Sequence, residues 1–112
     1  MMKAKITEVN GLIAQKERSI LSYNIGIRES NISLKELDKM NKIFINMKTG
    51  IDGDLFIEYR EKSENLIIEE KEGFELSIIE TKEELKVLKS NLRKLEKIQT
   101  EFEKLNVMNL GA

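Results

Sequence analysis

Hydrophobic positions recur at alternating spacings of three and four residues along two long stretches of the chain. A repeat of this kind places one apolar stripe on each of two α-helices, as in a coiled coil. The first stripe passes through Ile6, Val9, Ile13, Lys16, Ile20, Tyr23, Ile27, Ser30, Leu34, Leu37, Asn41 and Phe44. The second passes through Phe74, Ile78, Thr81, Leu85, Leu88, Leu92, Leu95, Gln99 and Phe102.

The two stripes are separated by the segment KTGIDGD, which holds two glycines in a chain that has no proline. Glycine adopts positive φ at little cost, and an aspartate can accept hydrogen bonds from the free N–H groups of a helix start. The pattern predicts a helix over residues 4–48, a hinge over 49–53 and a helix over 54–106. Long helices joined by so short a turn must lie antiparallel. We therefore expect an all-α fold, a long antiparallel two-helix coiled-coil hairpin that forms one domain over residues 1–112.

Several residues depart from a purely apolar stripe. Lys16 and Ser30 lie on the first stripe, where polar side chains either set the register of the helices or face a partner. Glu64 and Lys71 fall on the projected stripe between the hinge and Phe74, so the pattern is weaker there. Three glycines inside the helices are interpreted as places where neighbouring side chains approach closely. They are Gly11, Gly26 and Gly73.

Composition narrows the chemistry of the chain. The chain has 112 residues, of which 35% are charged, and it contains no Trp, Cys or His. Without thiol or imidazole groups the usual nucleophile, general base and zinc ligands are missing, and no glycine-rich phosphate loop is present. We expect no enzymatic activity, no cofactor and no metal site. No apolar run approaches the roughly 20 residues of a membrane span, and the N-terminus lacks a signal-peptide core, so we expect a cytoplasmic protein that is not integral to a membrane.

Charge is distributed unevenly along the chain. Residues 1–28 carry five basic and two acidic side chains, and residues 85–105 carry six and three, which gives +3 for each segment. Residues 52–84 carry twelve acidic and four basic side chains, a balance of −8. In an antiparallel hairpin the two basic segments lie side by side, and such a field orients docking into an acidic socket. A balance of +3 is too small to neutralise the roughly 6 to 10 phosphates of a nucleic-acid site, so we expect no nucleic-acid partner.

Two segments resemble the central stalk proteins of type III secretion ATPase complexes, the SctO/FliJ family. They are ERSILSYNIGIRESNISLKELDKMNKIF before the hinge and LFIEYREKSENLIIEEKEGFELSIIETKEELKVLKSNLRKLEKIQTEFEKL after it. The short chain is most similar to the small member of the Mxi–Spa invasion-type branch. This resemblance implies a part that inserts its paired chain ends into a hexameric secretion ATPase, as the γ subunit does in a rotary ATPase. The hinge end of such a part reaches the cytoplasmic ring of the export gate, and members of the family also handle secretion chaperones. The chain is shorter than typical members of this family.

By position, the resemblance assigns the ATPase-ring contact to basic residues of both helices, namely Arg18, Lys86, Lys89, Arg93, Lys94 and Lys97. It assigns the export-gate contact to apolar residues near the hinge, namely Phe44, Met47, Leu55, Phe56 and Tyr59. The implied location is the cytoplasmic face of a secretion apparatus that exports virulence effectors.

Two other functions are compatible with a helical hairpin. One is a small partner or adaptor of a type VII-like secretion system, which would carry a W-x-G-like turn at the hinge. The segment KTGIDGD has the glycine but no Trp. The other is a generic coiled-coil scaffold.

A single stripe of contacts between two helices predicts marginal stability, so we expect the isolated chain to be partly helical or to self-associate.

Overall fold

The structure, a computed structural model, describes the backbone of residues 2–46 and 52–111 and the side chains of residues 2–43 and 57–107. This part of the chain forms the helices α1 (Met2–Asn46) and α2 (Asp52–Gly111) and no strand. The all-α class expected from the sequence is confirmed. Asp52 and Gly53, expected in the hinge, belong to α2, and the rest of the expected hinge lies outside the described residues.

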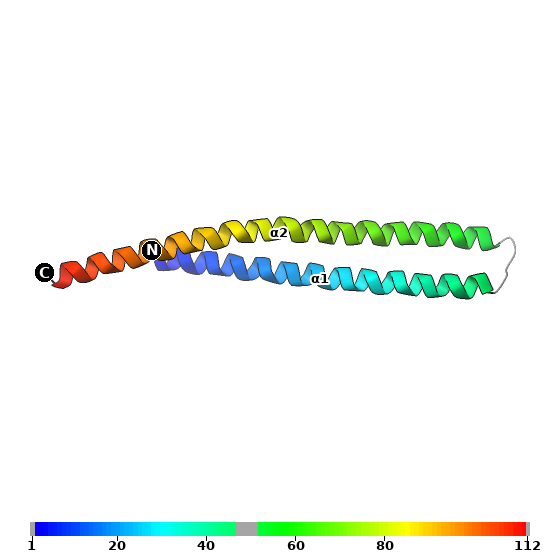
Figure 1. Ribbon diagram of the computed structural model, residues 1–112, viewed down its shortest axis with the longest axis horizontal. Coiled ribbons are helices and arrows are strands. Elements are labelled where there is room, and N and C mark those ends of the chain that lie inside the picture. The colour runs from blue at the N-terminus through cyan, green and yellow to red at the C-terminus, as the bar shows by residue number, and fades with distance from the viewer. Residues whose placement is uncertain (1, 47–51, 112) are drawn as a thin grey trace. The chain divides into compact units, whose positions relative to one another are not determined.

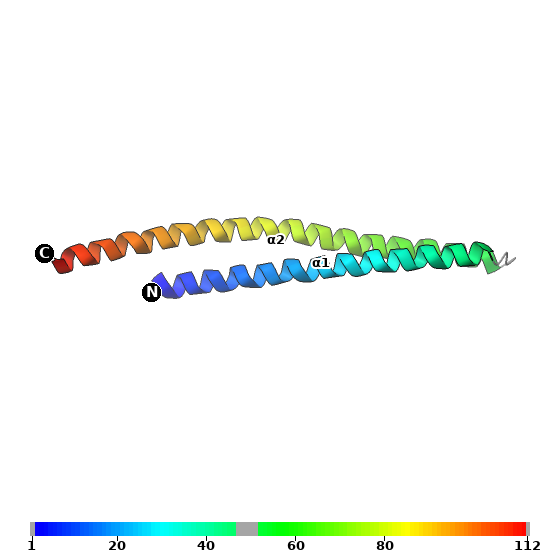
Figure 2. The ribbon, with the colours of Figure 1, turned by 60° about the horizontal axis from the view of Figure 1, so that its bottom comes forward.

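The chain divides into two compact units, each built from a segment of α1 and a segment of α2. The first unit joins the start of α1, up to Ile20, to the part of α2 from Ile79 onward, and the second unit is Leu21–Ile78. Within each unit the two helix segments pack side by side and run in opposite directions (Figures 1 and 2). The expected antiparallel pairing is therefore present in both units.

The core of the first unit is the stripe that the heptad pattern predicts. Val9, Ile13 and Leu85 are buried, and Ile20, Leu88, Leu92 and Leu95 pack against them. Every stripe position from Ile6 to Asn41, and every one from Phe74 to Gln99, is buried or half-buried. Apolar side chains spaced by three and four residues share one helix face, and that face is the one the other helix covers.

Phe102 is the exception, because its side chain is 61% exposed. The sequence pattern placed Phe102 on the buried stripe, and that placement is wrong. In the first unit the last part of α2, drawn orange to red, continues past the start of α1 (Figures 1 and 2). The repeat therefore continues in the sequence of this last part of α2, where α1 does not run beside it.

In the second unit, the side chain of Phe74 fills the space that a glycine leaves open. The rings of Tyr23 and Phe74 lie with their centroids 6.3 Å apart, tilted by 36°, a usual separation for an aromatic pair. A Cβ on Gly26 would lie 2.6 Å from Cε2 of Phe74. Gly11 and Gly73 have no such neighbour within 4 Å of the same position, so the interpretation of these two glycines as close-approach sites is wrong.

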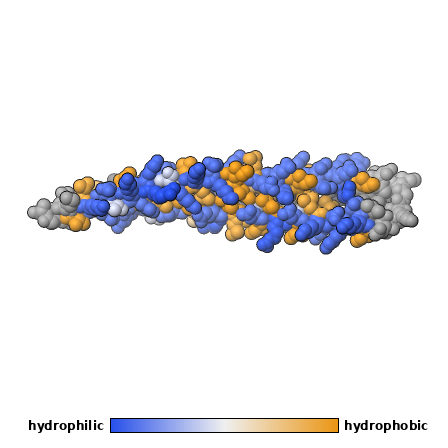
Figure 3. Space-filling model, viewed as in Figure 1, coloured by the Kyte–Doolittle hydropathy of each residue, from blue (hydrophilic) through white to orange (hydrophobic). Residues whose placement is uncertain are grey.

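The packing between the helices is shallow. No described side chain is fully buried, and polar Ser30 and Thr81 are among the most covered residues. Between the hinge and Phe74, Glu64 and Lys71, the two charged residues on the projected stripe, are half-buried. A pair of helices has one contact face and no further layer to cover the other faces. Figure 3 accordingly shows apolar residues lying among hydrophilic ones on the visible surface.

Candidate functional site

The six basic residues expected at the ATPase ring all belong to the first unit, and all six are exposed. Arg18 is on α1 and the others are on α2. Lys86, Arg93 and Lys97 are spaced by seven and four residues, which places them on one face of the helix. The structure thus brings these cations into one unit.

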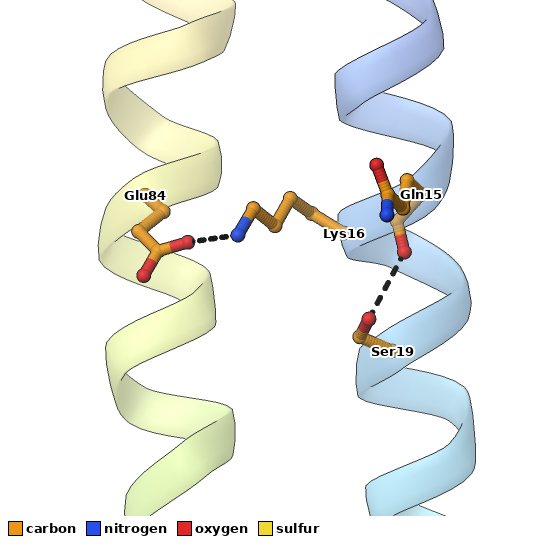
Figure 4. Close-up of polar contacts among 4 residues, drawn as sticks. All are labelled: Gln15, Lys16, Ser19 and Glu84. Carbon is orange, nitrogen blue, oxygen red and sulfur yellow. Dashed lines mark hydrogen bonds and ion pairs between the residues drawn. The ribbon is translucent and has the colours of Figure 1, made fainter.

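Two ion pairs within the first unit involve charged residues that were counted, in the charge of their segments, as available to a partner. The Nζ atom of Lys89 lies 3.6 Å from a carboxylate oxygen of Glu17. Lys16, a polar residue of the stripe, reaches from α1 across to Glu84 on α2 (Figure 4). The total charge of a segment does not show which residues of two neighbouring helices lie at the same height. The pairing of Lys89 with Glu17 was therefore not predicted.

The last part of α2 forms an apolar surface that the sequence analysis did not identify. Ile98, Phe102 and Leu105 are exposed and follow one another at spacings of four and three residues, so they share a face. A shallow groove of about 320 Å³ is lined by Lys97, Ile98, Glu101, Phe102 and Leu105. This groove combines uncovered apolar area with charged neighbours, a composition found at protein-binding surfaces. The same spacing is readable in the sequence, but it was assigned to the interhelical stripe.

A second groove lies on another face of the same segment. Its volume is about 400 Å³, and its lining residues are Thr100, Glu103, Lys104 and Val107. Thr100 donates its hydroxyl to the carbonyl oxygen of Glu96 at 2.9 Å, and Gln99 donates from Nε2 to a carboxylate oxygen of Glu103 at 3.1 Å. These bonds lie within α2, and the Glu103 carboxylate at the groove already accepts one of them.

Of the five residues expected at the export gate, only Tyr59 has a described side chain, and it is 67% exposed. Phe44, Leu55 and Phe56 are helical, but their side chains lie outside the described residues, as does the whole of Met47. Ile57, next to this group, is also exposed. The described part of the region therefore offers an aromatic and an aliphatic side chain for contact.

The second unit also contains a half-open cavity beside the Gly26–Phe74 contact. Its volume is about 160 Å³, and its lining includes Ser30, Ser33, Ile67 and the acidic residues Glu29 and Glu70. Among the described side chains, no three metal-binding groups converge, here or elsewhere. None of the described helix segments has an apolar stretch long enough to cross a membrane.

Comparison with known proteins found no matching family, no matching curated protein and no matching solved structure.

Proposed function

We propose that this protein is the central stalk of a type III secretion ATPase complex, coupling the hexameric ATPase to the export gate during effector secretion. The proposal is supported by the resemblance of residues 17–44 and 55–105 to the SctO/FliJ stalk family. It is also supported by the antiparallel packing of two helix segments within each unit.

The observation that carries the proposal is the composition of the last part of α2, from Lys97 to Leu105. There the exposed apolar face of Ile98, Phe102 and Leu105 is accompanied by exposed Lys97 and Lys104. A single helix is narrow enough to enter a channel, basic side chains are attracted to an acidic rim, and uncovered apolar groups gain by burial against a partner. This segment and the nearby cations therefore form the proposed ring contact.

The proposed mechanism is mechanical coupling without chemistry on the stalk itself. An asymmetric helix pair inside a six-fold ring cannot contact all six subunits alike. Its orientation and the nucleotide state of each subunit must then bias one another, and this linkage is reciprocal. The export-gate ring, contacted through residues such as Tyr59, would receive the resulting motion.

The proposal is tested by capture of purified partners on the immobilised chain. The partners are a hexameric secretion ATPase, the cytoplasmic ring of an export gate, and DNA as a negative. We expect both protein rings to bind and DNA to be washed away. Reversing Arg93 and Lys97 to Glu should weaken ATPase binding about tenfold or more, since partner-facing charges steer and stabilise docking.

The matched control reverses Lys35 and Lys39, two exposed cations of the second unit, and should leave ATPase binding unchanged. Failure of the unmodified chain to bind either ring would refute the stalk proposal. Equal losses in the two charge-reversal variants would show that net charge alone governs binding, and the assignment of the ring contact would then be wrong.

A further inference from the structure

A second stripe on α1, within the second unit, faces away from α2. Its members follow one another at spacings of four and three residues, so they share one helix face. All are exposed, whereas the interhelical stripe of the same segment, from Tyr23 to Leu37, is buried or half-buried. The outer α1 stripe combines three apolar and three basic side chains and consists of Leu21, Ile25, Arg28, Ile32, Lys35 and Lys39.

The outer face of α2 in the same unit has the opposite charge. It repeats at the same spacings and is also exposed. Leu76 is 57% exposed there, and Lys62 forms an ion pair with Glu58 on the same helix at 3.3 Å. The outer α2 stripe consists of Glu58, Lys62, Asn65, Glu69, Glu72 and Leu76.

The two outer stripes are matched in height within the unit. Phe74 contacts both Tyr23 and the Gly26 position, so these residues lie level with one another. Because the helices are antiparallel, residues before Phe74 on α2 are level with residues after Gly26 on α1. Arg28 is therefore level with Glu72, and Leu21 is level with Leu76.

We propose that the outer α1 stripe of one copy packs against the outer α2 stripe of a second copy, side by side and in register. In that arrangement the Arg28 guanidinium meets the carboxylates of Glu69 and Glu72, and Leu21 and Ile25 cover Leu76. The charge order favours a second copy at two heights, because Arg28 is level with Glu72 and Lys39 is level with Glu58. Lys35 is level with Lys62, whose ammonium group is paired with Glu58 on its own helix. The inference does not depend on the proposed secretion function.

The contact joins two different surfaces, so it is heterologous. In a row of side-by-side copies each molecule keeps one free stripe of each kind, and the association continues beyond a dimer. Exposed ion pairs are weak and are screened by salt. The association is therefore weak, rises steadily with concentration, and weakens as the salt concentration is raised.

Sedimentation equilibrium of the full chain tests the proposal. We expect the average mass to rise with concentration past that of a dimer, and the association constant to fall about tenfold or more between roughly 50 and 500 mM salt. The variant Arg28→Glu/Lys39→Glu has two acidic stripes, and Glu69→Lys/Glu72→Lys has two basic ones. Each should be monomeric alone, and an equal mixture of the two should associate.

The control mixture combines Lys3→Glu/Lys104→Glu with Glu96→Lys/Glu101→Lys, which have the same net charges but intact outer stripes. Each control variant should associate alone, as the unmodified chain does. Circular dichroism verifies that every variant keeps its helicity.

Leu21→Ser/Ile25→Ser, which removes apolar contact without changing charge, should also reduce association. A monomeric unmodified chain, a mass that stops at a dimer, or control variants that are monomeric alone would each overturn the proposal.

Discussion

At the scale of single residues, the three glycines inside the helices have different surroundings and should respond differently to alanine. At Gly26 a Cβ would lie 2.6 Å from Cε2 of Phe74 and 2.7 Å from Cζ, so the ring must move. We expect Gly26→Ala to lower the free energy of unfolding by about 1 kcal/mol, because the cost of overpacking exceeds the gain in helix propensity. Chemical denaturation followed by circular dichroism measures this change.

Gly11 and Gly73 provide the matched comparison, because a Cβ at either position meets nothing within 4 Å. Alanine at these positions should stabilise the chain by roughly 0.5–1 kcal/mol through helix propensity alone. In a Phe74→Leu background the aromatic ring is absent, and Gly26→Ala should then also stabilise. If Gly26→Ala remained destabilising without the ring, the contact with Phe74 would not be the cause.

Two adjacent residues distinguish the covered stripe from the outer face. Ile20 packs against the core of the first unit, whereas Leu21 is 62% exposed. Aspartate at residue 20 places a charge in the interhelical contact, and we expect a loss of about 2–4 kcal/mol and of much of the helicity. Aspartate at residue 21 should cost less than about 1 kcal/mol, because the carboxylate stays hydrated.

Leu92→Asp, on the covered stripe of α2, should match the effect at Ile20, and replacement of exposed Glu83 should have almost none. Helical content of dilute samples, read by circular dichroism, gives the result. Similar losses at Ile20 and Leu21 would mean that the register of the helices is wrong.

At the scale of the helices, ion pairs across the contact fix which residues are level. Lys16 pairs with Glu84, and the Lys16 side chain is 35% exposed. Lys16→Glu should destabilise the hairpin by up to about 1 kcal/mol, since a partly exposed pair is weak and the reversal adds repulsion. The double variant Lys16→Glu/Glu84→Lys should recover most of the loss in a denaturation cycle. If the change in the free energy of unfolding of the double variant equalled the sum of the changes in the two single variants, the ion pair would not be formed.

The sequence was sufficient to predict the helices and the covered face of each, because the three-and-four repeat is a direct consequence of helix geometry. A repeat on one helix does not reveal where the other helix stops beside it, so Phe102 was misplaced. Nor does it reveal which residues are level, so the Phe74 ring over Gly26 and the Lys89–Glu17 pair were not predicted.

At the scale of the whole molecule, the two units expose different chemistry. The first unit exposes the six cations of the expected ring contact, whereas the second exposes Tyr59 and the acidic outer face of α2. An exposed side chain of one unit makes no contact in the core of the other unit. Substituting that side chain should therefore leave the packing of the other unit unchanged. The two proposed partner contacts should therefore be separable by substitution.

The separation can be tested at Tyr59, whose ring is exposed and available as an anchor. We expect Tyr59→Ala to weaken binding to the export-gate ring about tenfold, the loss typical of an aromatic contact residue, while helicity and ATPase binding stay unchanged. Leu66→Ala is the matched control, since Leu66 is equally exposed on α2, at 67%, and was not assigned to the gate contact. Binding of each purified variant to the isolated gate ring and to the isolated ATPase provides the measurement. If Tyr59→Ala weakened ATPase binding while Arg93→Glu/Lys97→Glu did not, the two contacts would have to be exchanged between the units, and the charge argument for the ring contact would fail.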